Sequence, residues 1–69
     1  MRIKYRKELE ELGWKFNTID SMKDYYVFDR RDERLNIDTG KLKITHYNFE
    51  LSYETLKVVM KILKDEVGE

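Results

Sequence analysis

The chain has a single histidine, His46, which is the side chain best suited to acid–base chemistry at neutral pH. It lies in "ITHYNFELSYETL" (residues 44–56), where a strand pattern gives way to a helical one. Imidazole titrates near physiological pH, so His46 could act as a general base or a metal ligand. The alternative is a polar residue that ends a strand at the rim of the core and hydrogen-bonds to backbone or water. We favour this alternative, because no second histidine and no cysteine could complete a metal site.

Acidic side chains are the second group that could carry chemistry. The stretch "IDTGKLK" places Asp38 near Lys41 and Lys43, the residue types of a magnesium-dependent nuclease. A turn explains the same aspartate, because Asp hydrogen-bonds readily to local backbone, and we favour the turn. The three glycines are far apart, and calcium-loop, phosphate-loop, dinucleotide and nucleophile-elbow motifs are missing. We therefore predict a protein that is not an enzyme, with no catalytic residue, metal or cofactor.

Composition narrows the class further. Sixty-nine residues form one domain, 1–69, near the lower size limit for a chain without crosslinks. Fourteen basic residues balance 14 acidic ones, which counts against nucleic acid as the main partner, since phosphate binding relies on a basic excess. No apolar run approaches the length of a membrane span, and the missing cysteines permit a reducing compartment. We expect a soluble, cytoplasmic protein.

The elements that must position these side chains follow from hydrophobic periodicity. Tyr5, Leu9 and Leu12 recur at helical spacing, which predicts a helix over residues 3–12 that Gly13 closes. Alternating and β-forming stretches predict strands, and clusters of polar residues predict turns at 20–24 and 29–34. The expected strands are 14–19, 25–30, the first arm of a hairpin beginning at 35, and 42–47, with positive φ tolerated at Asp38-Thr39-Gly40.

The last helix is predicted to begin after Ser52, a good N-cap. Its main apolar stripe, which Val59 widens, is expected to face the sheet, whereas Val58 and Ile62 fall off the stripe. Either the first helix covers these two residues or another molecule does. The fold class is α+β with the order α-β-β-β-β-α, an antiparallel meander with both helices packed on one face. The stripe consists of Tyr53, Leu56, Met60, Leu63 and Val67.

The surplus apolar surface predicts a protein partner or a homodimer. The first candidate surface is Val58 and Ile62, and the second is the open sheet face, which carries Tyr25 and Tyr47. We expect a small protein–protein interaction module, a regulator, adaptor or inhibitor of the kind that phages and mobile elements encode. Two other classes stay open: a metal-dependent enzyme that uses His46, and an RNA-binding module. In the RNA-binding class, sheet aromatics stack on bases beside the basic residues Arg30, Arg31 and Lys43.

Two segments, "LEELGWKF" and "ITHYNFELSYETLKVVMKIL", are similar to the opening and closing stretches of the HicA-type mRNA-interferase toxins. The resemblance implies a double-stranded-RNA-binding-like fold of helices on a sheet, with His46, Thr55 and Leu56 at matching positions. The catalytic histidine of that family lies in a "GSH"-like turn before the second strand. Here the turn reads "IDSMKDYY", which retains Ser21 but has no histidine. The resemblance therefore implies an RNA-binding or vestigial interferase module as the alternative function.

Overall fold

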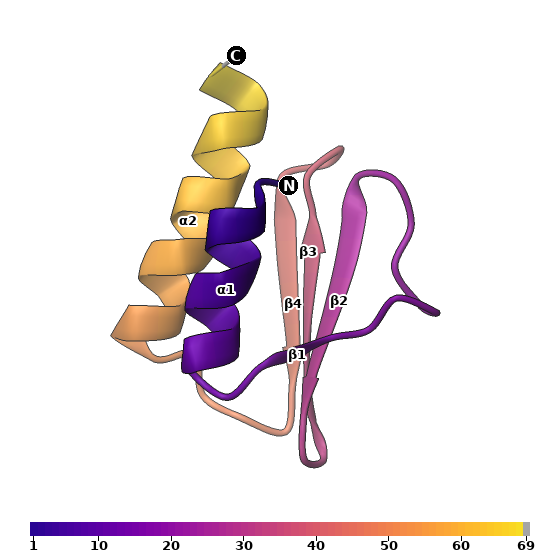
Figure 1. Cartoon of the computed structure of the whole chain (residues 1–69), viewed down its shortest axis with the longest axis vertical. Helices are drawn as coiled ribbons and strands as arrows, with labels where there is room; N and C mark the ends of the chain where they lie inside the picture. The colour runs from indigo at the N-terminus through magenta and orange to yellow at the C-terminus, as the bar shows by residue number, and fades with distance from the viewer. Residues whose placement is uncertain (69) are drawn as a thin grey trace.

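The chain folds as a helix, a four-stranded antiparallel sheet and a second helix (Figure 1). The computed structural model describes the backbone of residues 1–68 and the side chains of residues 1–65. The two helices run in opposite directions on the same face of the sheet, as Figure 1 shows. The predicted α-β-β-β-β-α fold is confirmed. In chain order the elements are α1 (Ile3–Glu11), β1 (Lys15–Phe16), β2 (Tyr25–Arg30), β3 (Glu33–Asp38), β4 (Lys43–Tyr47) and α2 (Tyr53–Gly68).

The sheet is a meander in which each strand pairs with the next, in the order β1-β2-β3-β4. Residues paired across neighbouring strands point to the same face, so the register sorts side chains between the two faces. The row formed by Phe28, Leu35 and His46 faces the helices, since Phe28 and Leu35 are fully buried in the core. The neighbouring row, which contains Val27 and Asn36, faces away from the helices. We call this second face the open face.

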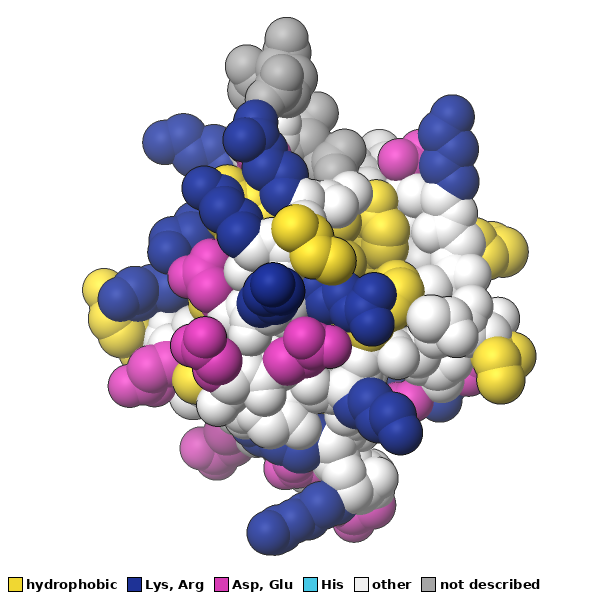
Figure 2. All heavy atoms as spheres, viewed as in Figure 1, with side chains coloured by type: hydrophobic (Ala, Val, Ile, Leu, Met, Phe, Trp, Pro, Cys, Tyr) yellow, Lys and Arg dark blue, Asp and Glu magenta, His cyan; other side chains and the backbone are white. Residues whose placement is uncertain are grey.

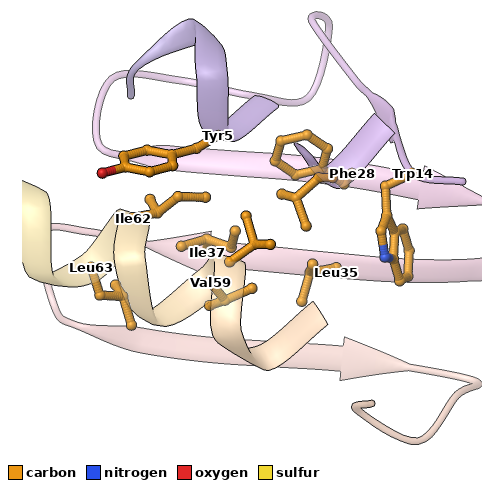
Figure 3. Packing of buried hydrophobic residues seen from close by; sticks show 10 residues of the cluster. Tyr5, Trp14, Phe28, Leu35, Ile37, Val59, Ile62 and Leu63 are labelled. Atoms are coloured by element: carbon orange, nitrogen blue, oxygen red, sulfur yellow. The ribbon is translucent and has the colours of Figure 1, made fainter. Parts of the chain in front are cut away.

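The core lies between the sheet and the two helices (Figure 3). Figure 3 shows Val59 and Ile62 of α2 pointing toward Ile37 of β3, with Tyr5 of α1 on the far side of Ile62. Large apolar side chains from every layer are therefore removed from water together, which is the main stabilising contribution in a chain of this size. The buried cluster comprises Tyr5, Leu9, Trp14, Phe28, Leu35, Ile37, Val58, Val59, Ile62 and Leu63.

A glycine and an arginine fix the end of α1. Gly13 has a φ of +95°, and a Cβ at this position would lie 3.1 Å from Cδ of Arg30. The Arg30 guanidinium lies 4.2 Å from the ring centre of Trp14 and donates a 2.9 Å hydrogen bond to the carbonyl of Leu12. The carbonyl at the end of the helix is thereby satisfied, as a helix C-terminus requires. The predicted role of Gly13 as a helix stop is confirmed, and the close approach of Arg30 is a second reason for glycine.

The first strand is shorter than predicted, because it ends at Phe16 and not at residue 19. Asn17 turns the chain: its side-chain oxygen accepts hydrogen bonds from the backbone N–H groups of Ile19 and Asp20, at 3.0 and 2.9 Å. Such local bonds offer the backbone an alternative to a strand ladder. Ile19 consequently stands almost fully in solvent.

The predicted strand 25–30 is confirmed, whereas the predicted turn over the charged stretch 29–34, which overlaps that strand, is wrong for the four residues that lie in β2 or β3. Only residues 31 and 32 connect β2 to β3. The flanking charges face each other across the hairpin, so that Arg30 bonds to Glu33 at 2.8 Å on one face of the sheet. Asp29 and Arg34 form the equivalent 2.8 Å pair on the open face. Opposite charges in paired positions stabilise a hairpin, which is why the strands continue through a highly charged sequence.

The second helix begins at its predicted cap. The Ser52 hydroxyl accepts a hydrogen bond from the N–H of Thr55 at 3.2 Å and donates to the Thr55 hydroxyl at 3.1 Å. Thr55 is buried, and its hydroxyl also accepts the indole N–H of Trp14 at 3.4 Å. One threonine therefore joins the helix cap to the core.

The rotation of α2 about its axis differs from the prediction. Val58 and Ile62, expected to be surplus, are buried, with exposed fractions of 6% and 1%. Tyr53 and Met60, expected to face the sheet, are exposed. The reason is that α2 packs against α1 as well as the sheet, so its apolar contacts are spread over two neighbours. The side chain of Val67, the last member of the predicted stripe, lies outside the described residues.

Candidate protein-binding groove

An apolar groove of about 750 Å³ runs between α2 and β4 on the helix side of the sheet. Three of its lining side chains are large, apolar and exposed: Leu42 at 52%, Tyr53 at 71% and Met60 at 53%. Contiguous apolar surface on a folded chain is typical of a binding site, whereas scattered single residues are not. We call this feature the α2–β4 groove. Its lining consists of Leu42, Ile44, Tyr53, Leu56, Lys57, Met60, Lys61, Leu63 and Lys64.

Leu42 lies in a backbone conformation that leucine rarely adopts. Its φ is +55°, in the left-handed region where a side chain crowds the following carbonyl. The positive φ predicted for Asp38-Thr39-Gly40 does not occur there, because Asp38 accepts the N–H of Lys41 at 2.9 Å and the reversal comes two residues after Gly40. A residue that is both strained and half exposed contributes little to folding. A leucine at this position is consistent with a role on the surface.

Among the described side chains, the charged residues that line the groove are all lysines of α2. Figure 2 shows acidic and basic side chains intermixed over the face that carries the helices, with basic ones concentrated over α2. Lys61 bonds to Glu8 of α1 at 3.1 Å, and the Lys57 ammonium lies 5.2 Å from the Tyr53 ring centre. Lys64 is exposed. The groove is therefore apolar at its floor and positive along one rim, although the chain as a whole is neutral.

The strand beside the groove is the last in the sheet. β4 pairs with β3 on one side, and among the described residues no segment pairs with its other edge. Alternate backbone N–H and C=O groups of such a strand point outward and can bond to another chain. The outer edge of β2 is different, because β1 and the loop after it cover it. Asn17 donates to the Val27 carbonyl at 2.8 Å, and the Ser21 hydroxyl accepts the Val27 N–H at 2.8 Å.

His46 lies exposed at the end of β4, on the helix side of the sheet. Its Nδ1 is 3.0 Å from the carbonyl oxygen of Phe49, and the two rings meet edge to face. A carbonyl can only accept, so Nδ1 carries the proton in this bond. The prediction of a strand-end histidine bonded to backbone is confirmed, and the bond helps to turn the chain from β4 toward α2.

The two tyrosines predicted on the open face are on that face but far apart. Tyr25 is half-buried at the start of β2, and Tyr47 is 50% exposed at the end of β4. They are separated by two strand spacings and four residues along the strands, or roughly 16 Å. The open face between them is polar, so the tyrosines do not form one apolar patch.

Ion pairing dominates the open face at the end nearest Tyr47. Arg34 bonds to Asp29 at 2.8 Å and to Asp20 at 3.1 Å, and Asn17 bridges the two carboxylates. Hydrogen bonding from the Arg34 guanidinium holds the pKa of Asp29 below its ordinary value, and the Asn17 amide acts in the same direction. The same pairing raises the pKa of Arg34. The network fixes the loop after β1 against the sheet.

The basic residues of the RNA-binding alternative are dispersed. Arg30 is stacked on Trp14, and Arg31 projects from the adjacent turn with a φ of +56°. Lys43 begins β4, which is the opposite end of the sheet in an antiparallel meander. At about 3.3 Å per residue, the length of a strand separates Lys43 from the two arginines.

The sequence interpretation did not place the groove. Tyr53, Leu56 and Met60 form one helical stripe in the sequence, but the sequence does not show that Tyr53 and Met60 are exposed in the fold. A usable signal was the row of lysines that follows this stripe, because a stripe with lysines along one side more often borders solvent than core. Leu42 carried no signal of its own, since nothing local favours a left-handed leucine.

Within the described residues no three His, Cys, Asp or Glu side chains are grouped so that they could hold a metal ion. No helix in that part of the chain is long and apolar enough to cross a membrane. No family model, curated protein or solved structure matches the chain.

Proposed function

We propose that this chain is a small, non-enzymatic protein-interaction module, a regulator, adaptor or inhibitor that binds its partner in the α2–β4 groove. The observation that carries the proposal is the exposure of Leu42, Tyr53 and Met60 around one groove. Removal of such side chains from water on binding contributes about 25 cal/mol per Å². Aromatic residues and methionine are also favoured in the buried centre of interfaces.

The proposal moves the binding surface away from the residues that the sequence favoured. Val58 and Ile62 belong to the buried core, so a partner could contact them only if the chain unfolded. Tyr25 and Tyr47 stand too far apart to act as one anchor. The groove offers a floor of apolar side chains, two neighbouring elements to shape it, and an unpaired strand edge beside it.

Affinity capture from a lysate, quantified by mass spectrometry, tests the proposal with matched variants. Met60→Asp places a charge in the groove at a position that is already exposed. Met22→Asp is the control, because Met22 is 69% exposed in the loop that leads to β2. We expect a protein that wild type and Met22→Asp retain and Met60→Asp loses. Identical capture by all three chains would contradict the proposal.

A further inference from the structure

The side chains around the α2–β4 groove also indicate the chemistry of the segment that binds there. We propose that the occupant is an extended, acidic segment of another protein, which adds to the outer edge of β4 as a fifth strand. Its helix-facing side chains, which are every second residue of the segment, would include both apolar groups that enter the groove and carboxylates that meet the lysines of α2. This inference rests on the proposed function, since it names the partner of the same groove.

The first argument is the position of the free strand edge. A strand added to β4 would lie about 4.8 Å beyond it, on the side where the groove opens. Its side chains on the helix side would then meet Ile44 of β4, Leu42 directly before β4 and Met60 of α2, which line the groove. β4 spans five residues, which is sufficient for several main-chain hydrogen bonds. Strand addition of this kind takes affinity from the main chain and specificity from pockets for alternate side chains.

The second argument compares the two sheet edges. The outer edge of β2 is occupied by a two-residue strand, by Ser21, and by an isolated bridge between Met22 and Tyr25. Folded proteins usually protect an edge strand with such devices or with charges on the strand. β4 carries only Lys43 at its start, followed by Ile-Thr-His-Tyr. The edge strand at the far side of the sheet, β1, is therefore only two residues long, whereas β4 offers five residues to a further strand.

The third argument is charge. Lys57, Lys61 and Lys64 stand along the α2 side of the groove, and among the side chains of residues 1–65 no acidic one lines it. A segment with Asp or Glu among its helix-facing residues, beside the apolar ones, would bring carboxylates to this rim and would be attracted during approach. Attraction of this kind is strongest at low salt, because a surface pair is screened within about 8 Å at physiological ionic strength.

The same charge argues against a second copy of this chain as occupant. A two-fold axis that paired β4 with β4 would bring the α2 helices together in opposite directions. Lys57 of one copy would then approach Lys64 of its partner across the axis, and like charges in contact disfavour association. The lysine rim therefore selects for a partner of opposite charge.

A peptide-display library tests the inference directly. Its ten-residue members have threonine at every second position, and the positions between, which share one face of a strand, vary among apolar residues, Asp, Glu, Lys and Arg. We expect selection on the wild-type chain to enrich acidic over basic members by at least about tenfold. One enriched peptide, added to the labelled chain, should protect amides of β4 from hydrogen exchange and leave those of β2 unchanged.

Two variants control for charge. Lys57→Glu with Lys64→Glu reverses the rim while sparing Lys61, which is paired with Glu8. We expect this double variant to enrich basic peptides and to bind the acidic peptide roughly four- to twenty-five-fold more weakly, at about two- to fivefold per lysine. Lys23→Glu, in the loop before β2, should change neither result.

The outcomes separate the two proposals. Peptide binding that Met60→Asp abolishes, from a selection without preference for acidic members, would leave the groove as the binding site. It would overturn the proposal of an acidic partner. An acidic peptide that protects amides outside β4 would overturn strand addition. Light scattering that shows a dimer, lost in Met60→Asp, would make a second copy the occupant and also overturn the inference. No enrichment above an unrelated protein would overturn it as well, while the lysate capture still decides the proposed function.

Discussion

α2 has two apolar stripes with different destinations. The buried stripe consists of Thr55, Val58, Val59 and Ile62, all nearly inaccessible to solvent. The second stripe consists of the exposed Tyr53 and Met60 and the half-buried Leu56, which line the α2–β4 groove. We call it the exposed stripe. At 100° per residue, the centres of the two stripes are separated by roughly 140° around the helix. The helix therefore presents one apolar face to its own fold and another to the outside.

The composition of the two stripes follows these destinations. The buried stripe is built of β-branched residues, whose restricted side chains lose little freedom when they pack against the sheet. The exposed stripe is built of tyrosine, leucine and methionine, longer side chains that can adapt to a partner. A helix that served only the fold would need the first stripe alone. The second stripe explains why α2 is more apolar than its packing requires.

The largest expected effect on the free energy of unfolding comes from a truncation in the buried stripe, and the matched truncation lies in the exposed stripe. Ile62→Ala should lower the free energy of unfolding by about 2–5 kcal/mol, because it leaves a cavity among fully buried side chains. The free energy of unfolding of the wild-type chain is only roughly 3–10 kcal/mol, so this variant will be partly unfolded at 37 °C. Met60→Ala should change the free energy by less than about 0.5 kcal/mol. Urea denaturation followed by circular dichroism measures both.

Similar effects of Ile62→Ala and Met60→Ala on stability would contradict the distinction between a buried and an exposed stripe. Equal losses would mean that Met60 is covered in solution, by a second copy or by a rotation of α2. Repeating the denaturation over a hundredfold range of concentration distinguishes these two cases, since the stability of a dimer rises with concentration. A concentration-independent loss at Met60 would place the exposed stripe in the core.

The sequence was sufficient for the order of elements because each element carried its own local signal. Gly13 closed α1, Ser52 began α2, and period-two stretches marked β2 and the arms of the hairpin. The failures share another cause, since each depends on a contact between residues far apart in the chain. The rotation of α2 depends on α1, which covers part of the helix that a sheet alone would leave open. Periodicity gives the directions in which a helix is apolar, but not which direction meets a neighbour.

The groove shows the same limit. Leu42 and Met60 are 18 positions apart, and only the packing of α2 beside β4 brings them together. The charged residues at 29–34 were similarly assigned to a turn, because their cross-strand pairing depends on the register of the hairpin. Local polarity indicated solvent, whereas the pairing of opposite charges allowed the strands to continue.

The polar member of the buried stripe gives the next largest effect. Thr55→Val keeps the shape of the side chain but removes the acceptor for the Trp14 indole N–H, which lies in the core. A buried donor without a partner costs about 1–3 kcal/mol, so we expect a loss of stability in that range. Thr45→Val, on a strand with no such partner among the hydrogen bonds described, is the matched control and should be near neutral. A neutral Thr55→Val would show that the 3.4 Å bond contributes nothing.

A smaller effect of opposite sign is expected at Leu42. Leu42→Gly relieves a left-handed leucine, so the free energy of unfolding should rise by up to about 1 kcal/mol. The same change removes an apolar side chain from the groove, so peptide binding should weaken. Thermal denaturation and a binding titration on the same sample test the pair of expectations. A gain in stability without a loss of binding would remove Leu42 from the exposed surface that recognises the partner.

The smallest effect concerns the open face, which is held by charge and not by an apolar stripe. Because the Arg34 guanidinium lowers the pKa of Asp29, this carboxylate stabilises the fold above the pKa it has when unfolded, about 3.9. The contribution is lost as the pH falls through the lower folded pKa. Urea denaturation at pH 7 and pH 3 should therefore show a smaller loss on acidification for Asp29→Asn than for wild type. In an Arg34→Ala background, Asp29→Asn should make a smaller further difference, because only the Asn17 amide then lowers the pKa of Asp29. An equal loss of stability on acidification in wild type and Asp29→Asn would mean that the Asp29–Arg34 pair does not stabilise the fold. The sheet would then be stabilised mainly by apolar packing.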